Sequence, residues 1–168
     1  VAPEAGSPAL GTAEKPFGSI ADAAAAMNSD TANYTIRISG KISGTQKLAN
    51  TLNGRAKSIT LCGLTGNTAD SLYGNNAGTV LIDSTTVPVT VKNLKISGGN
   101  AVKGGGIIVA SGATVTLESG ALIGGTAGTA AASSNSACAN YAQQGGGVYS
   151  EGTLILKNGS AVIYNYSD

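Results

Sequence analysis

The stretch that decides the fold is Val89–Ala127, VTVKNLKISGGNAVKGGGIIVASGATVTLESGALIGGTA. Its beginning, VTVKNLKISGGNA, aligns without a gap with its end, VTLESGALIGGTA, at an offset of 26 residues. A third copy, LILKNGSAVIYN, starts at Leu154, and each later copy follows a glycine triplet and a short hydrophobic run, GGGIIVASG or GGGVYSEG. Repeats of this length, with β-branched residues at every second position, are typical of a solenoid built from parallel strands.

The strand pattern extends toward the N-terminus, where Ile36 matches Ile59 after 23 residues and Ile59 matches Val89 after a further 30. Because side chains alternate between the two faces of a strand, two columns are predicted to point inward. They are Ile36, Ile59, Val89, Val115 and Leu154, and Ile38, Leu61, Val91, Leu117 and Leu156. The outward columns are Arg37, Thr60, Thr90, Thr116 and Ile155, and Ser39, Cys62, Lys92, Glu118 and Lys157. The alternating signs of the last three residues favour one register.

The composition agrees with a solenoid of one domain. The chain has 168 residues, of which 11% are charged, against roughly 25% in an ordinary soluble domain. It has 25 glycines, one phenylalanine and no tryptophan, so large side chains cannot fill a globular core. A net charge of +1 argues against a nucleic-acid partner. No segment is apolar enough to predict a transmembrane helix.

Residues 1–33 are predicted to form an extended lead-in and a short helix, and residues 34–168 the solenoid. Ser19 is a suitable helix N-cap, with Asp22 three residues later. An apolar stripe follows at Ile20, Ala23, Ala24 and Met27. Because the first strand is predicted to begin at Tyr34, the helix would cover the end of the hydrophobic stack; an ordinary surface helix is the alternative. The N-terminus lacks a basic start and an apolar run, and we interpret it as a mature or trimmed end.

Half of the ten basic residues fall between Asp30 and Asp70, where there is no acidic residue. They are Arg37, Lys41, Lys47, Arg55 and Lys57. One interpretation is a positive patch on the first coils that binds an anionic glycan or another partner. The other is solvated charge that keeps a surface rich in glycine and threonine soluble, and it is favoured because only Arg37 occupies a position of the strand frame.

A long insertion separates the last two copies, at about residues 126–144, in the low-complexity segment GTAAASSNSACANYAQ. Insertions in solenoids form loops, often on the binding face, and a disordered excursion is equally compatible with this composition. The insertion carries Cys138, and the only other cysteine, Cys62, is predicted to point outward two coils away. Such a pair tends to oxidise outside the cytoplasm, so a Cys62–Cys138 disulfide and two free thiols are both open.

The residues that most enzyme mechanisms need are missing from the sequence. Without histidine there is no Ser-His-Asp or Cys-His machinery and no histidine-based zinc site, and we expect no metal and no cofactor. The phosphate-loop, nucleophile-elbow and dinucleotide motifs are missing too. A polysaccharide lyase or glycosidase requires clustered carboxylates. Only Asp83 and Glu118 lie in predicted strands, and they share no column, so the chain is predicted not to be an enzyme.

Several phrases carry a resemblance to a known group of proteins. GTAEKPFGSIADAAAAM resembles the G-T-x-x-x-P-F-x-S-I-x-x-A start of many bacterial right-handed parallel β-helices. GGGI, GGGV and LILKNG resemble the GG[AG][IV] and LTLxNG phrases of pectate-lyase-like surface and autotransporter-type repeat proteins. The resemblance runs from about Gly11 to the end. It implies an all-β, right-handed parallel β-helix of about five coils with a short N-terminal capping α-helix. The calcium-binding aspartates and catalytic basic residue of pectate lyases are not recognisable here.

These observations predict a non-catalytic module that is secreted or lies on the bacterial cell surface. It would be adhesin-like or structural and would bind a glycan or protein of a host or of the environment. The alternative is a carbohydrate-active enzyme of the lyase or glycosidase kind, or its inactive remnant. A third function is ice binding through Thr60, Thr90 and Thr116, although the predicted column has only three threonines and ends in Arg37 and Ile155.

The last copy is predicted to leave the end of the stack uncovered. An apolar layer around Leu154, Leu156 and Val162 would be exposed, because no capping helix follows. Such an edge is a template for another strand, either in further coils of a longer protein or in an end-to-end pair of two copies. Alternatively, the tail from Tyr164 to Tyr166 would fold over the layer as a small aromatic lid.

Overall fold

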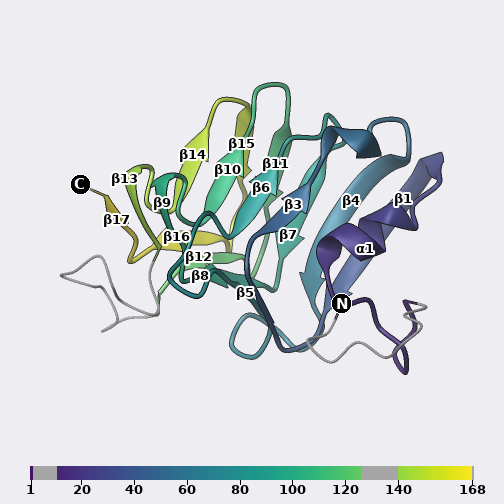
Figure 1. Ribbon diagram of the computed structural model, residues 1–168, viewed down its shortest axis with the longest axis horizontal. Coiled ribbons are helices and arrows are strands. Elements are labelled where there is room, and N and C mark those ends of the chain that lie inside the picture. Colours follow the sequence, from purple (N-terminus) through teal and green to yellow (C-terminus); the bar gives the residue numbers. More distant parts are fainter. Residues whose placement is uncertain (2–10, 126–139, 168) are drawn as a thin grey trace.

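The structure is a computed structural model, and it describes residues 1, 11–125 and 140–167 (Figure 1). Four sheets make up most of the described chain, and all of their strand pairs are parallel. Sheet A contains β1 (Ser29–Ile38), β4 (Ala56–Gly63), β7 (Val89–Lys92), β11 (Thr114–Leu117) and β15 (Thr153–Leu156). Sheet B contains β2 (Lys41–Ser43), β5 (Ser71–Tyr73), β8 (Lys95–Ser97), β12 (Leu122–Gly124) and β16 (Ala161–Ile163). Sheet C contains β3 (Gln46–Leu48), β6 (Leu81–Asp83), β10 (Ile107–Val109) and β14 (Val148–Ser150). Sheet D contains β9 (Asn100–Lys103), β13 (Tyr141–Gln144) and β17 (Tyr166–Ser167).

Successive strands of the chain belong to the sheets in a repeating order. We call each set of consecutive strands that begins with a strand of sheet A a circuit. The first two circuits run through sheets A, B and C, and later circuits add sheet D after sheet B. Each strand therefore pairs with the equivalent strand of the next circuit. The protein is mostly β with parallel sheets, which is compatible with the predicted all-β parallel solenoid.

The predicted register is confirmed for most of sheet A and is wrong at its first strand pair. Val89 pairs with Ile59 and with Val115, as predicted. In contrast, Ile36 pairs with Leu61 rather than with Ile59. Tyr34 takes the place opposite Ile59, and Ile38 lies opposite Gly63; β1 also begins at Ser29 rather than Tyr34 and contains an irregularity between Ser29 and Asn33. A shift of two residues keeps every side chain on its predicted face, so the alternation of apolar residues could not detect it.

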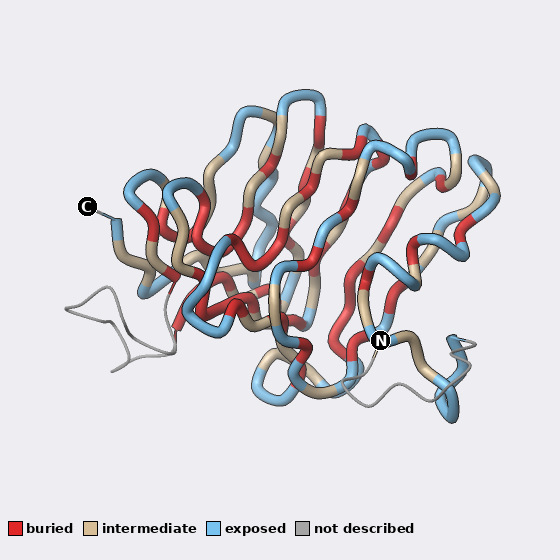
Figure 2. The backbone as a smooth tube through the Cα atoms, in the orientation of Figure 1, coloured by how far each residue is buried: buried red, intermediate tan, exposed pale blue. Residues whose placement is uncertain are grey.

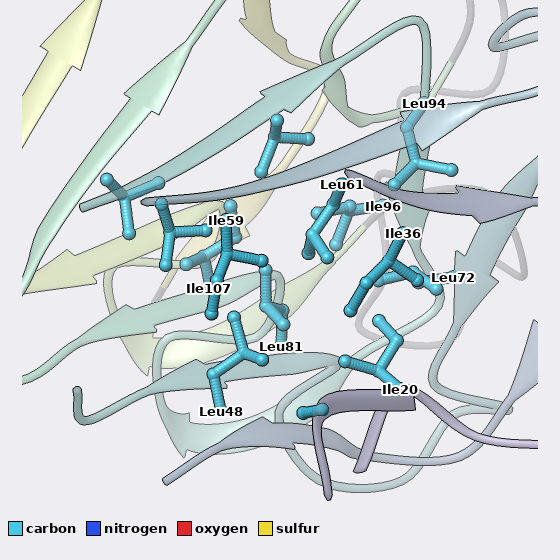
Figure 3. Packing of buried hydrophobic residues seen from close by; sticks show 14 of the residues in the cluster. Ile20, Ile36, Leu48, Ile59, Leu61, Leu72, Leu81, Leu94, Ile96 and Ile107 are labelled. Atoms are coloured by element: carbon cyan, nitrogen blue, oxygen red, sulfur yellow. The ribbon is translucent and has the colours of Figure 1, made fainter. Parts of the chain in front are cut away.

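The inward columns form one continuous hydrophobic core. Ile59, Leu61, Val89, Val91, Val115 and Leu117 are all at most 1% exposed. They meet the inward residues of sheets B and C, such as Leu72, Ile96, Leu81 and Ile107, across a narrow interior (Figure 3). Small and medium aliphatic side chains are enough to fill this space, which explains why the chain needs no tryptophan.

Helix α1 (Ile20–Ala25) lies over the first circuit and extends the core, as its apolar stripe predicts. Ser19 is the N-cap, because its Oγ accepts a hydrogen bond from the backbone N–H of Asp22 at 3.1 Å. Ile20 is fully buried and lies next to Ile36 and the other core residues of the first circuits (Figure 3). Its backbone N–H donates to Oε1 of the buried Gln46 at 3.1 Å, which ties the helix to β3. A short 3-10 helix, η1 (Asn50–Leu52), follows β3.

The glycine triplets stack on one another where sheet D meets sheet C. Gly104 and Gly145, the first members, have φ of +57° and +65°, a conformation that glycine adopts without strain. A Cβ on Gly105 would collide with the backbone oxygens of Tyr141 and Gly146 in the next circuit. The triplets therefore allow successive circuits to approach closely at a corner.

An asparagine ties three circuits together at the corner that follows sheet B. The buried Asn140 accepts a hydrogen bond from Gly99 N at 3.0 Å and donates to Ile96 O at 3.0 Å. It also donates to Oδ1 of Asn165 in the last circuit, at 2.9 Å. Asn140 lies within the predicted insertion at 126–144, as does β13, whereas residues 126–139 lie outside the described part of the chain.

Candidate ligand-binding face

The outer face of sheet A carries regular rows of small polar side chains. Thr35, Thr60, Thr90 and Thr116 occupy equivalent positions in four successive strands, followed by Ile155. A second row, two residues earlier along each strand, contains Asn33, Ser58, Thr114 and Thr153, and Pro88 interrupts it between Ser58 and Thr114. We call these eight residues the hydroxyl face. The register places neighbours about 4.8 Å apart along the threonine row, and the two rows lie about 6.6 Å apart.

The threonine row is longer than the sequence predicted, because the corrected register of β1 places Thr35 rather than Arg37 beside Thr60. Thr35 is exposed, and Thr60, Thr90 and Thr116 are half-buried. Ser58 Oγ donates to Asn33 Oδ1 at 2.7 Å. Within the described residues, none of the threonine hydroxyls of this face has a hydrogen-bond partner in the protein, so they remain available to water or to a ligand.

A charged column runs beside the threonine row. Its members are Arg37, Cys62, Lys92, Glu118 and Lys157, of which the last four were predicted to share a column. Lys157 Nζ lies 2.7 Å from Glu118 Oε1. The hydrogen bond from Lys157, opposed by slight burial and aided by the charges of Lys157 and Lys92, holds the pKa of Glu118 below its usual value.

The five cations predicted as one basic patch lie on strands and turns of three different sheets. Arg37 and Lys57 belong to sheet A, Lys41 to sheet B and Lys47 to sheet C. Lys41 Nζ lies 4.1 Å from the centre of the Tyr73 ring. Arg55 has a structural contact, since its guanidinium donates to the carbonyls of Met27 (2.9 Å) and Ala25 (2.8 Å) at the end of α1. The structure thus does not bring these five side chains together.

The buried carboxylates lie in separate environments. Asp70 accepts hydrogen bonds from Gly40 N at 2.7 Å, from Gly66 N at 3.1 Å and from both donors of Thr65. Burial alone raises the pKa of Asp70, but these bonds outweigh it and the pKa is lowered. Asp83 points into the core of sheet C and receives one bond, from Thr85 N at 3.0 Å, while its Oδ2 has no partner. Burial raises the pKa of Asp83 to about 7.

Asp83 and Glu118, the two acidic residues in predicted strands, are far from forming a pair. Asp83 is on sheet C and faces the interior, whereas Glu118 follows β11 of sheet A and is partly exposed. Within residues 1, 11–125 and 140–167, no group of three or more histidine, cysteine or acidic residues could hold a metal ion.

Cys62 is buried, although its outward position predicts exposure. It is 8% exposed, and its Sγ lies 3.3 Å from Gly63 O. In the register this small side chain lies between Arg37 and Lys92, and long flanking side chains of this kind cover a small neighbour. Cys138 lies outside the described residues, so its disulfide with Cys62 stays a prediction.

One hollow lies at each end of the stack. The one at the C-terminal end has a volume of about 450 Å³ and is lined by Leu154, Leu156, Val162 and their neighbours. These are the residues of the predicted apolar layer. Tyr166 stacks on Tyr141 of sheet D, with ring centres 5.5 Å apart, and Tyr164 is 39% exposed. The hollow at the other end, about 480 Å³, lies between residues 11–17, α1 and β1.

The comparisons with other proteins add no family to this description. No helix among the described residues has the length and apolar character needed to cross a membrane. Comparison of the chain with protein-family models, curated proteins and solved structures finds no match.

Proposed function

We propose that this chain forms a right-handed parallel β-helix that is displayed outside the bacterial cell and binds a glycan without transforming it. The parallel strand pairs between successive circuits support the β-helix. Right-handedness follows the general rule for crossovers between parallel strands. The repeat phrases and the low charge content support an extracellular surface protein. The open apolar end is compatible with end-to-end association of two copies.

The observation that carries the binding proposal is the hydroxyl face. Glycans present hydroxyl groups at regular intervals, and hydroxyl side chains both donate and accept hydrogen bonds. The threonine row on sheet A repeats at a constant spacing, and the threonine hydroxyls of this face have no hydrogen-bond partner within the described chain. A sheet also holds these side chains without the entropy cost of ordering a loop.

A glycan array with purified protein tests this proposal. The test variant combines Thr60→Ala, Thr90→Ala and Thr116→Ala, and the matched control combines Thr51→Ala, Thr68→Ala and Thr86→Ala at exposed positions away from sheet A. We expect the wild type and the control variant to bind the same glycans on the array, and the test variant to bind none of them. The proposal would be contradicted if the wild type bound no glycan, or if both variants lost binding to the same extent.

Ice binding is a second candidate, because the structure lengthens the threonine row. Four threonines in register, from Thr35 to Thr116, present identical methyl and hydroxyl groups at a constant spacing. A regular array of this kind can order water in a repeating pattern. Measurement of thermal hysteresis with the same two variants separates this candidate from glycan binding. Thermal hysteresis in the wild type that is lost in the test variant would support ice binding. The absence of thermal hysteresis in the wild type would exclude it.

A further inference from the structure

We infer that the glycan bound by the hydroxyl face is acidic, with its anionic groups held by Arg37, Lys92 and Lys157. This inference rests on the proposed glycan binding and adds the chemical class of the ligand. The three residues lie in the charged column of sheet A, directly beside the threonine row. We call them the cation row.

The cation row and the hydroxyl face belong to one surface. Arg37, Lys92 and Lys157 each follow the threonine row, or Ile155 in the last strand, by two residues. Residues at this separation point to the same side of a strand, about 6.6 Å apart. A polymer that lies along the threonines therefore passes beside the cations. At the other end of the strands, Asp30 and Lys57 provide one exposed charge of each sign.

The spacing of the cations favours a polysaccharide over other polyanions. The row has cations in the first, third and fifth strands of sheet A, with Cys62 in the second and Glu118 in the fourth. Alternate strands of such a stack are about 10 Å apart, which is close to the length of an extended disaccharide. Phosphates of a nucleic-acid strand follow one another at much shorter intervals. A polysaccharide with one carboxylate per disaccharide would thus place an anion at each cation.

Glu118 opposes the row and makes the inference sharply testable. It neutralises Lys157 through their contact at 2.7 Å, and its charge also acts on Lys92. Removal of this carboxylate frees Lys157 for a ligand, so Glu118→Gln is expected to tighten the binding of an anionic glycan. Lys92→Gln removes the central cation and is expected to weaken it. The two substitutions, each of which replaces a charged side chain with glutamine on the same surface, are therefore expected to change the affinity in opposite directions.

The experiment measures the affinity of the full chain for a fluorescent hyaluronan decasaccharide, which has one carboxylate per disaccharide. Lys47→Gln is the matched control, since Lys47 is an exposed outward lysine on sheet C. We expect Lys92→Gln to weaken binding about five-fold, Glu118→Gln to tighten it about three-fold and Lys47→Gln to change it less than about two-fold. Added salt should weaken the wild-type interaction.

Two results would overturn the inference. One is an equal effect of Lys92→Gln and Lys47→Gln, and the other is equal binding of a single-stranded oligonucleotide of the same charge. The protein could instead bind neutral chitin oligosaccharides, and only the variant with Thr60→Ala, Thr90→Ala and Thr116→Ala could lose this binding. That result would support the proposed glycan binding and reject an acidic ligand. Absence of binding to every neutral and acidic glycan would reject both.

Discussion

The two ends of the stack differ although their strands follow one pattern. Leu61, Val91 and Leu117 are fully buried, whereas Leu156, the next member of the same column, is 54% exposed. At the other end, α1 lies against the first circuit, and its Ile20 has no exposed surface. Figure 2 shows buried positions running from strand to strand and giving way to half-buried and exposed positions in the last circuit.

An inward residue of this fold is therefore fully buried only where a neighbouring circuit or a helix covers it, in addition to the residues of its own circuit. A strand supplies one layer of the core, and only a neighbouring layer or a helix excludes water from it. Identical residues in identical columns should therefore contribute very differently to stability, depending on how many neighbours they have.

The largest expected effect comes from a carboxylate placed in the closed part of the column. Val91→Asp should cost about 5 kcal/mol or more of unfolding free energy, because an unpaired charge would lie in a dry core. Leu156→Asp should cost far less, since water reaches that position. Urea denaturation of both variants checks this. Equal midpoints would show that the last circuit is as closed as the middle ones.

The buried carboxylate of Asp83 tests whether water is excluded from the middle of the core. Burial raises the pKa of Asp83 to about 7, whereas the ordinary value is 3.8. The unfolded chain therefore ionises first, so the contribution of Asp83 to stability is fully present below about pH 4 and is lost as the pH rises to about 7. The total change is of the order of 4 kcal/mol. Asp83→Asn should remove most of this decline, and so be more stable than the wild type at pH 8.

Asp70 provides the control for this measurement, because its pKa is shifted in the opposite direction. Its lowered pKa means that its contribution is present above its ordinary pKa and is lost as the pH falls. Asp70→Asn should therefore destabilise the protein at pH 7 and flatten the acid limb of the stability curve. A wild-type stability that does not decline between pH 4 and 7 once the Asp70 effect is subtracted would mean that Asp83 is hydrated.

A smaller effect is expected at the helix that closes the first circuit. Ser19→Ala removes the hydrogen bond to Asp22 N and should cost about 1 kcal/mol. Thermal unfolding measures the loss, and Ser19→Asp, which can still cap the helix, serves as the control. If both substitutions act alike, the cap does not stabilise the closed end.

The smallest effect is expected at the exposed ion pair between the last two strands of sheet A. Glu118→Gln breaks the contact with Lys157 and should change the unfolding free energy by less than about 0.5 kcal/mol, because solvent reaches both side chains, which are 34% exposed for Glu118 and 57% exposed for Lys157. Chemical denaturation at low and high salt checks this. A loss above about 1 kcal/mol would show that this pair holds the last circuit in place.

Part of the site could be predicted from the sequence and part could not. The outward positions of Thr60, Thr90 and Thr116 follow from alternation alone and are confirmed. The place of Thr35 in that row was missed, because the apolar pattern matches Ile36 and Ile38 to Ile59 and Leu61, whereas in the structure Ile38 pairs with Gly63. The cations were grouped by closeness in the sequence, whereas Lys92 and Lys157 join Arg37 only through the pairing of strands. In the sequence, the match of Ile59 to Val89, 30 residues later, already indicates that Lys92 lies beside Cys62 in this column.

The parallel β architecture, the inward and outward faces and the capped helix could all be predicted from the sequence alone. These depend on local rules: side chains alternate along a strand, and Ser19 meets Asp22 N within one helical turn. The three-dimensional structure was needed for the register of β1 against β4, for the burial of Asn140 and Asp83, and for the charges that lie beside the hydroxyl face. Those features depend on contacts between residues of different circuits, and shifts of two residues leave the local pattern unchanged while they move every one of those contacts.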